Sequence, residues 1–111
     1  MSTEISFLST SLRQLESIAE QSYNEHIAPV AVALWRKHLS KDNPQWDFIT
    51  AKPFSIKNKK GTAHVMAMVD KRLPGMGMVG YFACTTSEAG ALVLEEAVSW
   101  LKQSDLKDVY G

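Results

Sequence analysis

The chain has 111 residues, of which 45% are hydrophobic, and its 12 Lys and Arg balance 12 Asp and Glu to a net charge of zero. This length predicts one domain, residues 1–111, with a core that needs neither disulfides nor a structural metal. The balanced charge argues against a nucleic-acid partner, because phosphate binding depends on a basic surface.

The sequence contains few signals of cellular location. Cys84 is the single cysteine, so an internal disulfide is excluded and a reducing compartment is expected. The first residues lack a basic stretch followed by a long apolar run, and no apolar run reaches membrane-spanning length. We therefore expect a soluble cytoplasmic protein with no membrane partner.

The N-terminal part predicts a short strand and two helices. The strand is EISFL, whose apolar residues are Ile5, Phe7 and Leu8. Apolar residues then recur at helical spacing: Leu12, Leu15, Ala19 and Tyr23. A second helix is expected from about Ala28 to Leu39, because Pro29 is tolerated in a first turn. Its inward residues are expected to be Val30, Ala33, Leu34 and Leu39.

The middle of the chain predicts a meander of three strands after a polar linker at residues 40–45. The strands are expected at residues 46–57, 62–69 and 78–84. Asn58 to Gly61 is a hairpin signal, and residues 70–77 predict a loop. Pro53 marks an edge position or a bulge in the first of these strands. The second is apolar on both faces, which places it centrally.

A helix and a last strand complete the predicted order. One side of the helix is apolar, with Gly90, Val93, Leu94, Ala97 and Leu101. Residues 106–111 predict a final strand, parallel to the one before the helix. The order is β-α-α-β-β-β-α-β, an α+β layout with a mainly antiparallel three-strand meander flanked by helices.

This order resembles the first half of the GNAT N-acetyltransferase fold. Short sequence motifs of the family agree at Gly80-Tyr81-Phe82, at Ala97-Val98-Ser99-Trp100-Leu101 and at Val109-Tyr110-Gly111. The family fold continues with a further helix and two strands, which these 111 residues lack. That missing part usually completes the acceptor side of the cleft and often supplies the acid for the leaving thiolate.

The resemblance implies acetyl-CoA as cofactor and acyl transfer to an amine as activity. The expected contacts are the backbone of Tyr81, Phe82, Ala83 and Cys84 and the amides of Ser87, Glu88, Ala89, Gly90 and Ala91. The family's phosphate loop has the pattern Gln/Arg-x-x-Gly-x-Gly/Ala. Neither the alignment through Gly90 nor the alignment through Ala91 satisfies it, so the loop is degenerate.

The turn before this helix has a structural interpretation as well. Thr85 and Glu88 have the spacing of a capping box, in which the two side chains take up backbone amides of the first turn. Glu88 also places a negative charge where a phosphate would sit, and no Arg or Lys lies between Tyr81 and Trp100. The turn is therefore a capped helix start or a phosphate site.

Two further residues have both a chemical and a structural interpretation. Cys84, beside a helix N-terminus, suits a reactive thiol, but a single cysteine on an apolar strand more often packs in the core. His64 suits a general base if its face opens on a cleft, but a mid-strand His is more often half-buried and hydrogen-bonded. No acidic residue lies at ligand spacing around any His, so no metal is expected.

Three functions remain open. The chain is an acyl-CoA-dependent N-acyltransferase, a non-catalytic GNAT-like module that binds a small molecule or a protein, or an unrelated α+β binding module. Whether it is an enzyme is undecided, and no catalytic residue is assigned. An unpaired strand edge near Lys107 to Tyr110 predicts a homodimer or a partner chain that covers it.

Overall fold

The computed structural model of the chain describes residues 7–103 and 108–110. Their elements are, in order, α1 (Phe7–Ser22), α2 (Ala28–His38), the 3-10 turn η2 (Pro44–Asp47), β1 (Ile49–Asn58), β2 (Gly61–Asp70), β3 (Met76–Cys84), α3 (Ser87–Gln103) and β4 (Asp108–Tyr110). The α+β class and the antiparallel meander are confirmed.

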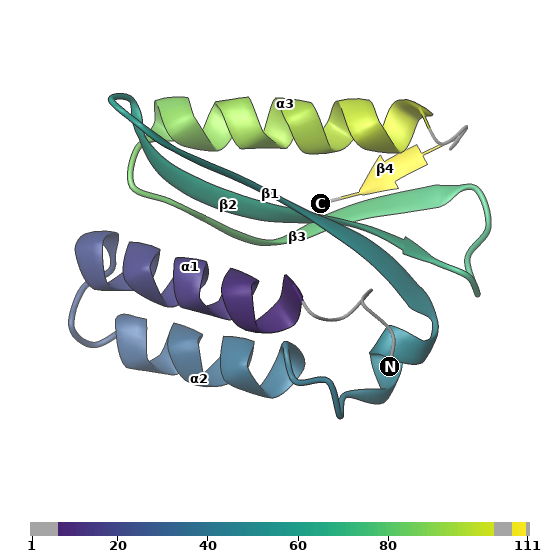
Figure 1. Cartoon of the computed structure of the whole chain (residues 1–111), viewed down its shortest axis with the longest axis horizontal. Helices are drawn as coiled ribbons and strands as arrows, with labels where there is room; N and C mark the ends of the chain where they lie inside the picture. Colours follow the sequence, from purple (N-terminus) through teal and green to yellow (C-terminus); the bar gives the residue numbers. More distant parts are fainter. Residues whose placement is uncertain (1–6, 104–107, 111) are drawn as a thin grey trace.

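The four strands form one sheet in the order β1-β2-β3-β4. β1, β2 and β3 are antiparallel neighbours, and β4 runs parallel to β3, with Met76 to Met78 opposite Asp108 to Tyr110. The predicted last strand is therefore present and parallel to the strand before the helix. Figure 1 shows α3 on one face of the sheet and α1 on the other, with α2 beyond α1.

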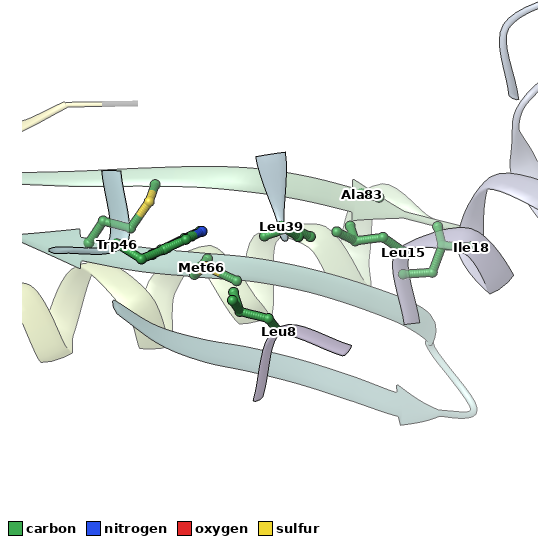
Figure 2. Packing of buried hydrophobic residues seen from close by; sticks show 8 residues of the cluster. Leu8, Leu15, Ile18, Leu39, Trp46, Met66 and Ala83 are labelled. Atoms are coloured by element: carbon green, nitrogen blue, oxygen red, sulfur yellow. The ribbon is translucent and has the colours of Figure 1, made fainter. Parts of the chain in front are cut away.

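The central strand β2 is buried on both faces, as its sequence predicted. Ala63, Val65 and Ala67 pack with the buried face of α3. Met66 and Met68 face α1 and belong to a second cluster, whose members include Leu8, Leu15, Ile18, Leu39, Trp46 and Ala83 (Figure 2). Complete burial of a Leu or Ile side chain stabilises the fold by about 1.5–3 kcal/mol each.

The prediction of a strand at residues 4–8 is wrong at Phe7 and Leu8, which are the described residues of that segment. Phe7 and Leu8 begin α1, and Ile5 lies outside the described residues. Leu8 is buried, and it continues the stripe of Leu12, Leu15 and Ala19 at helical spacing. The tertiary packing of this stripe on the sheet places the helix start earlier than the serine-threonine run suggested.

The orientation expected for α2 is also wrong, except at Leu39, which is buried. Val30 and Leu34 are 61% and 52% exposed, and Ala33 is exposed. The partly buried side of α2 carries Trp35 instead. Because α2 is apolar on two sides, periodicity alone does not decide which side faces inward.

The first meander strand begins later than expected. Residues 44–47 form η2, capped by the Asn43 side chain, whose Oδ1 accepts a hydrogen bond from the Gln45 amide at 3.1 Å. Trp46 at this turn is buried, and its indole Nε1 donates to the His38 carbonyl at 3.1 Å. β1 has β2 as its one neighbour in the described sheet, so Pro53 lies on an edge strand as predicted.

Candidate functional site

The strand β3 carries a bulge at the start of the predicted site. Met66 pairs with Gly80 and His64 with Ala83, so Val65 of β2 lies opposite both Tyr81 and Phe82. Tyr81 has a φ of +52°, which is uncommon for a residue with a side chain. Bulges redirect side chains and are frequent beside binding sites.

Side chains on both sides of Tyr81 fix this bulge. His64, fully buried on β2, has its Nδ1 2.9 Å from the Tyr81 carbonyl oxygen, where it donates a hydrogen bond. The Tyr81 hydroxyl accepts a hydrogen bond from Gln45 Nε2 at 3.0 Å, and its ring lies 6.4 Å from that of Trp46. Burial lowers the pKa of His64, more than the Tyr81 hydrogen bond raises it. His64 is thus a neutral support of the bulge, without the open cleft that a general base needs.

Beyond the bulge, the outer edge of β3 has no neighbouring strand among the described residues. β4 pairs with Met76 to Met78 alone, so Val79 to Cys84 lie past its end. The Thr85 amide donates to the Thr62 carbonyl of β2 at 2.8 Å. Since backbone groups alternate in direction along a strand, the backbone of Cys84 points to the open edge. This edge can accept an extended, amide-containing ligand.

The turn into α3 is capped by Thr86, and the capping box predicted for Thr85 and Glu88 is wrong. Thr86 Oγ1 accepts from the Ala89 amide at 3.1 Å and donates to the Lys60 carbonyl at 2.6 Å. Thr85 Oγ1 accepts from the Thr62 amide at 2.9 Å, so it serves the sheet. Either Thr85 or Thr86 could cap the helix from its sequence position. Because Thr85 Oγ1 bonds to β2 and Thr86 also bonds to the hairpin, Thr86 is the cap.

Glu88 has a cationic neighbour that the local sequence did not reveal. Lys60, at the tip of the β1–β2 hairpin, places its Nζ 3.5 Å from Glu88 Oε1, and both side chains are more than half exposed. The expectation of an uncompensated negative charge is therefore wrong. Within the described part of the chain, the amides of Ser87 and Glu88 have no hydrogen-bond acceptor, while those of Ala89 and Gly90 bond to Thr86.

Gly90 allows α3 to pack closely on the end of β3. A Cβ at Gly90 would lie 2.9 Å from Phe82 Cζ and 3.0 Å from Cys84 Sγ. Phe82 is 40% exposed and Cys84 is partly buried. The glycine that resembled part of a phosphate loop therefore has a packing role, and Cys84 lies at the strand end as predicted.

The structure thus brings the nine predicted residues together in one strand, turn and helix start. The exposed ones are Phe82, Ser87, Glu88 and Ala91; Tyr81 and Cys84 are partly buried; and Ala83, Ala89 and Gly90 are buried. The site also includes Lys60 and Thr86, which the motif comparison missed. The sequence predicted the β1–β2 hairpin and showed the lysines at its tip. It has no local signal for the contact between this tip and the turn before α3, because the two segments are distant in the chain.

Tyr23, at the end of α1, is a titratable group near this site. Burial raises its pKa, and the Cys84 thiol adds to the rise. Its ring also packs against Trp35, with 5.9 Å between centroids. The raised pKa keeps the phenol protonated at neutral pH and makes it a weaker acid than a free tyrosine.

A separate groove of about 240 Å³ lies between α1 and the β1–β2 hairpin. Arg13 and Lys57 line it together with Gln14, Ser17, Gln21, Ser55, Ile56, Thr62 and Ala63. The Gln14 amide reaches across it to Ser55 Oγ at 3.4 Å. The groove is on the α1 side of the hairpin, so it does not include the turn into α3.

Two classes of site are absent from residues 7–103 and 108–110. No three side chains from His, Cys, Asp and Glu gather there as a metal site. None of the helices in this part of the chain combines the length and apolar character that a membrane span requires.

Comparison of the chain with family models, with curated proteins and with solved structures gave no match.

Proposed function

We propose that this chain binds an acyl-CoA-type ligand along the open part of β3, with the first turn of α3 receiving a phosphate group. One observation carries the proposal: the stretch of β3 from Val79 to Cys84, whose outer edge has no neighbouring strand in the described structure, leads into the N-terminus of α3. The amides of a pantetheine arm can bond to a strand edge as an added strand does. A pyrophosphate then meets the positive end of the helix dipole. The resemblance to the GNAT fold supports the same assignment.

Binding of the phosphate group at the first turn of α3 depends on Lys60, Ser87 and Glu88. The Ser87 and Glu88 amides have no acceptor in the described structure, so they are available to an anion. Glu88 competes for the same position, but its ion pair with Lys60 is exposed and therefore weak. When Glu88 swings away, Lys60 is left to pair with the phosphate.

Acyl transfer is the second candidate function, and Tyr23 is the observation that favours it. A transferase must protonate the thiolate of the departing CoA, and the Tyr23 hydroxyl is the candidate donor because of its place near the Cys84 end of the ligand edge, not because of its pKa. Cys84, at the end of the proposed ligand edge, is near enough to Tyr23 to add to the rise of its pKa, although Tyr23 packs with the α1 cluster and Cys84 with the α3 cluster. The non-catalytic alternative requires the open edge alone.

Calorimetry with acetyl-CoA tests the binding proposal on the wild type and three variants. Ser87 is the first helical residue, where proline is tolerated, so Ser87→Pro removes one amide donor and keeps the helix. We expect it to weaken binding by about tenfold or more. Glu88→Gln removes the competing charge, so it should bind more tightly. Glu95→Gln, on the exposed side of α3, is the matched control and should bind as the wild type does.

The outcomes separate the candidates. No binding by the wild type or by Glu88→Gln overturns the proposal, because both the edge and the turn are then closed to the ligand. Binding without turnover of any amine favours the non-catalytic module. For a transferase, Tyr23→Phe should lower kcat by about 100-fold or more while acetyl-CoA affinity stays unchanged.

A further inference from the structure

The outer face of α2 is the most apolar exposed surface on one element of the described structure. Ile27, Val30 and Leu34 are 54%, 61% and 52% exposed. Ile27 caps α2 with helical φ and ψ angles, so these residues lie three and four positions apart on one stripe. Lys37, three positions after Leu34, extends the same line. We call Ile27, Val30, Leu34 and Lys37 the α2 stripe.

The other large exposed apolar residues do not form such a group. The Phe48 ring is covered by the Arg72 guanidinium at 4.4 Å, and Phe82 packs toward Gly90 at the start of α3. Leu73 lies alone in the loop between β2 and β3. Isolated exposed apolar residues are ordinary on folded proteins, but three on one helix face indicate an interaction surface.

The position of α2 leaves this surface open. α2 packs on α1, and no residue of α2 is fully buried. Figure 1 shows α2 as the outermost helix on its side of the sheet. The α2 stripe therefore faces away from the domain, where a second helix can lie along it.

We propose that a second copy of this chain covers the α2 stripe, with the two α2 helices antiparallel about a two-fold axis. Ile27 and Leu34 lie three and four positions on either side of Val30, so antiparallel pairing about an axis near Val30 brings Ile27 of one copy onto Leu34 of the other. The Val30 residues then meet near the axis. This geometry gives each copy the same contacts, as a closed dimer requires.

Charge complementarity favours the antiparallel arrangement. The last turn of α2 is basic, with Arg36, Lys37 and His38, and its start follows the exposed Glu25. Arg36 is engaged with Glu16 of its own chain at 2.8 Å, but Lys37 has no acidic partner within 4 Å among the described residues. Antiparallel pairing places Lys37 of one copy near Glu25 of the other and also pairs opposite helix dipoles. Parallel pairing would place Lys37 against Lys37.

Sedimentation over concentrations from low micromolar to millimolar tests this dimer. We expect the wild type to dimerise and Leu34→Glu to raise the dimer Kd by about 100-fold or more. Leu73→Glu changes an equally apolar but isolated exposed residue, and it should leave the Kd unchanged. Because Leu34 is half exposed in one chain, circular dichroism should show that its variant stays folded.

Charge reversal tests the proposed contact of Lys37 with Glu25. Lys37→Glu and Glu25→Lys should each weaken the dimer, and the double variant should restore it. A monomeric wild type at the highest concentration overturns the proposal. A dimer that persists in Leu34→Glu overturns it too, and would favour the sheet edge near Tyr110 as the interface.

Disulfide trapping tests the direction of the helices, in a Cys84→Ser background. A mixture of Ile27→Cys chains with Leu34→Cys chains should form mixed disulfides. Leu34→Cys alone should not cross-link, because antiparallel pairing separates its two copies by about 10 Å along the helix. Efficient cross-linking of Leu34→Cys with itself would contradict the antiparallel arrangement.

Discussion

His64 on β2 and Tyr81 on β3 are joined at the bulge, where His64 Nδ1 donates to the Tyr81 carbonyl oxygen across 2.9 Å. The bond satisfies a carbonyl that the positive φ of Tyr81 turns away from the regular ladder. A fully buried histidine thus holds the backbone whose outer edge forms the candidate site. The support is on the α1 side of the sheet, and the edge stays open.

The first prediction concerns the pH dependence that His64 gives to stability. Burial lowers its folded pKa below the ordinary value of 6.5, so the unfolded chain binds the proton more readily. The contribution of neutral His64 is complete above about pH 6.5 and falls as pH is lowered toward its folded pKa. We expect the free energy of unfolding to decrease over this window in the wild type.

Denaturant unfolding of His64→Leu measures this contribution. The variant should lose about 1–3 kcal/mol at neutral pH, because the Tyr81 carbonyl loses its donor. The difference between wild type and variant should then shrink as pH falls to about 5. His26→Gln is the control, since His26 is 87% exposed and its loss should not change the profile. A pH-independent difference for His64→Leu would contradict the assigned shift.

A second prediction concerns the contact of the hairpin with the turn before α3. Gly61 has a φ of +131°, and a Cβ there would lie 2.5 Å from Thr86 Oγ1. Gly61→Ala combines backbone strain with this clash, so thermal unfolding should show a loss of about 2–4 kcal/mol. Lys59→Ala changes an exposed neighbour in the same turn and should have little effect. Equal stability of Gly61→Ala and wild type would show that the hairpin tip does not pack on the turn.

A third prediction identifies the cap of α3. Thr86→Ala removes the side chain that bonds the Ala89 amide, and we expect it to cost about 1–2 kcal/mol in denaturant unfolding. Thr86→Ser should keep most of that energy, because serine caps as well. Ser87→Ala, one residue later and exposed, serves as the control. If Thr86→Ala is neutral while Glu88→Ala is costly, the capping box expected from the sequence would be favoured after all.

The sequence predicted the elements of this fold better than their contacts. Strand alternation at residues 62–69 and helical spacing at residues 90–101 report which side chains are buried, and both segments appear where expected. At α2 the same reasoning failed, because Val30 and Leu34 on one side are as apolar as Trp35 and Leu39 on the other. Only packing on α1 decides between the two sides.

The candidate site was predictable in its location and not in its chemistry. Tyr81 to Ala91 are continuous in the chain, so a strand–turn–helix pattern was enough to place them together. Lys60 reaches Glu88 from 28 residues away, and the bulge at Tyr81 depends on pairing with β2. Neither long-range contact has a local signal, and both change how an anion would be received at the turn.

The last prediction concerns Asp70 and Arg72 at the end of β2. Arg72 Nη2 lies 2.7 Å from Asp70 Oδ2, and Arg72 Nε and its backbone amide each lie 2.9 Å from Oδ1. The side-chain hydrogen bond from Arg72, with its backbone hydrogen bond second, lowers the pKa of Asp70 from 3.8 to about 2. The stabilisation is complete above the unfolded pKa near 3.8, and it is lost as pH falls through about 2.

In urea unfolding at a series of acid pH values, the stability difference between wild type and Asp70→Asn should therefore shrink from about pH 4 downward. Asp42→Asn, on an exposed turn, should show no such change. A difference that stays constant down to about pH 2 would mean that Arg72 does not stabilise the charged carboxylate in solution.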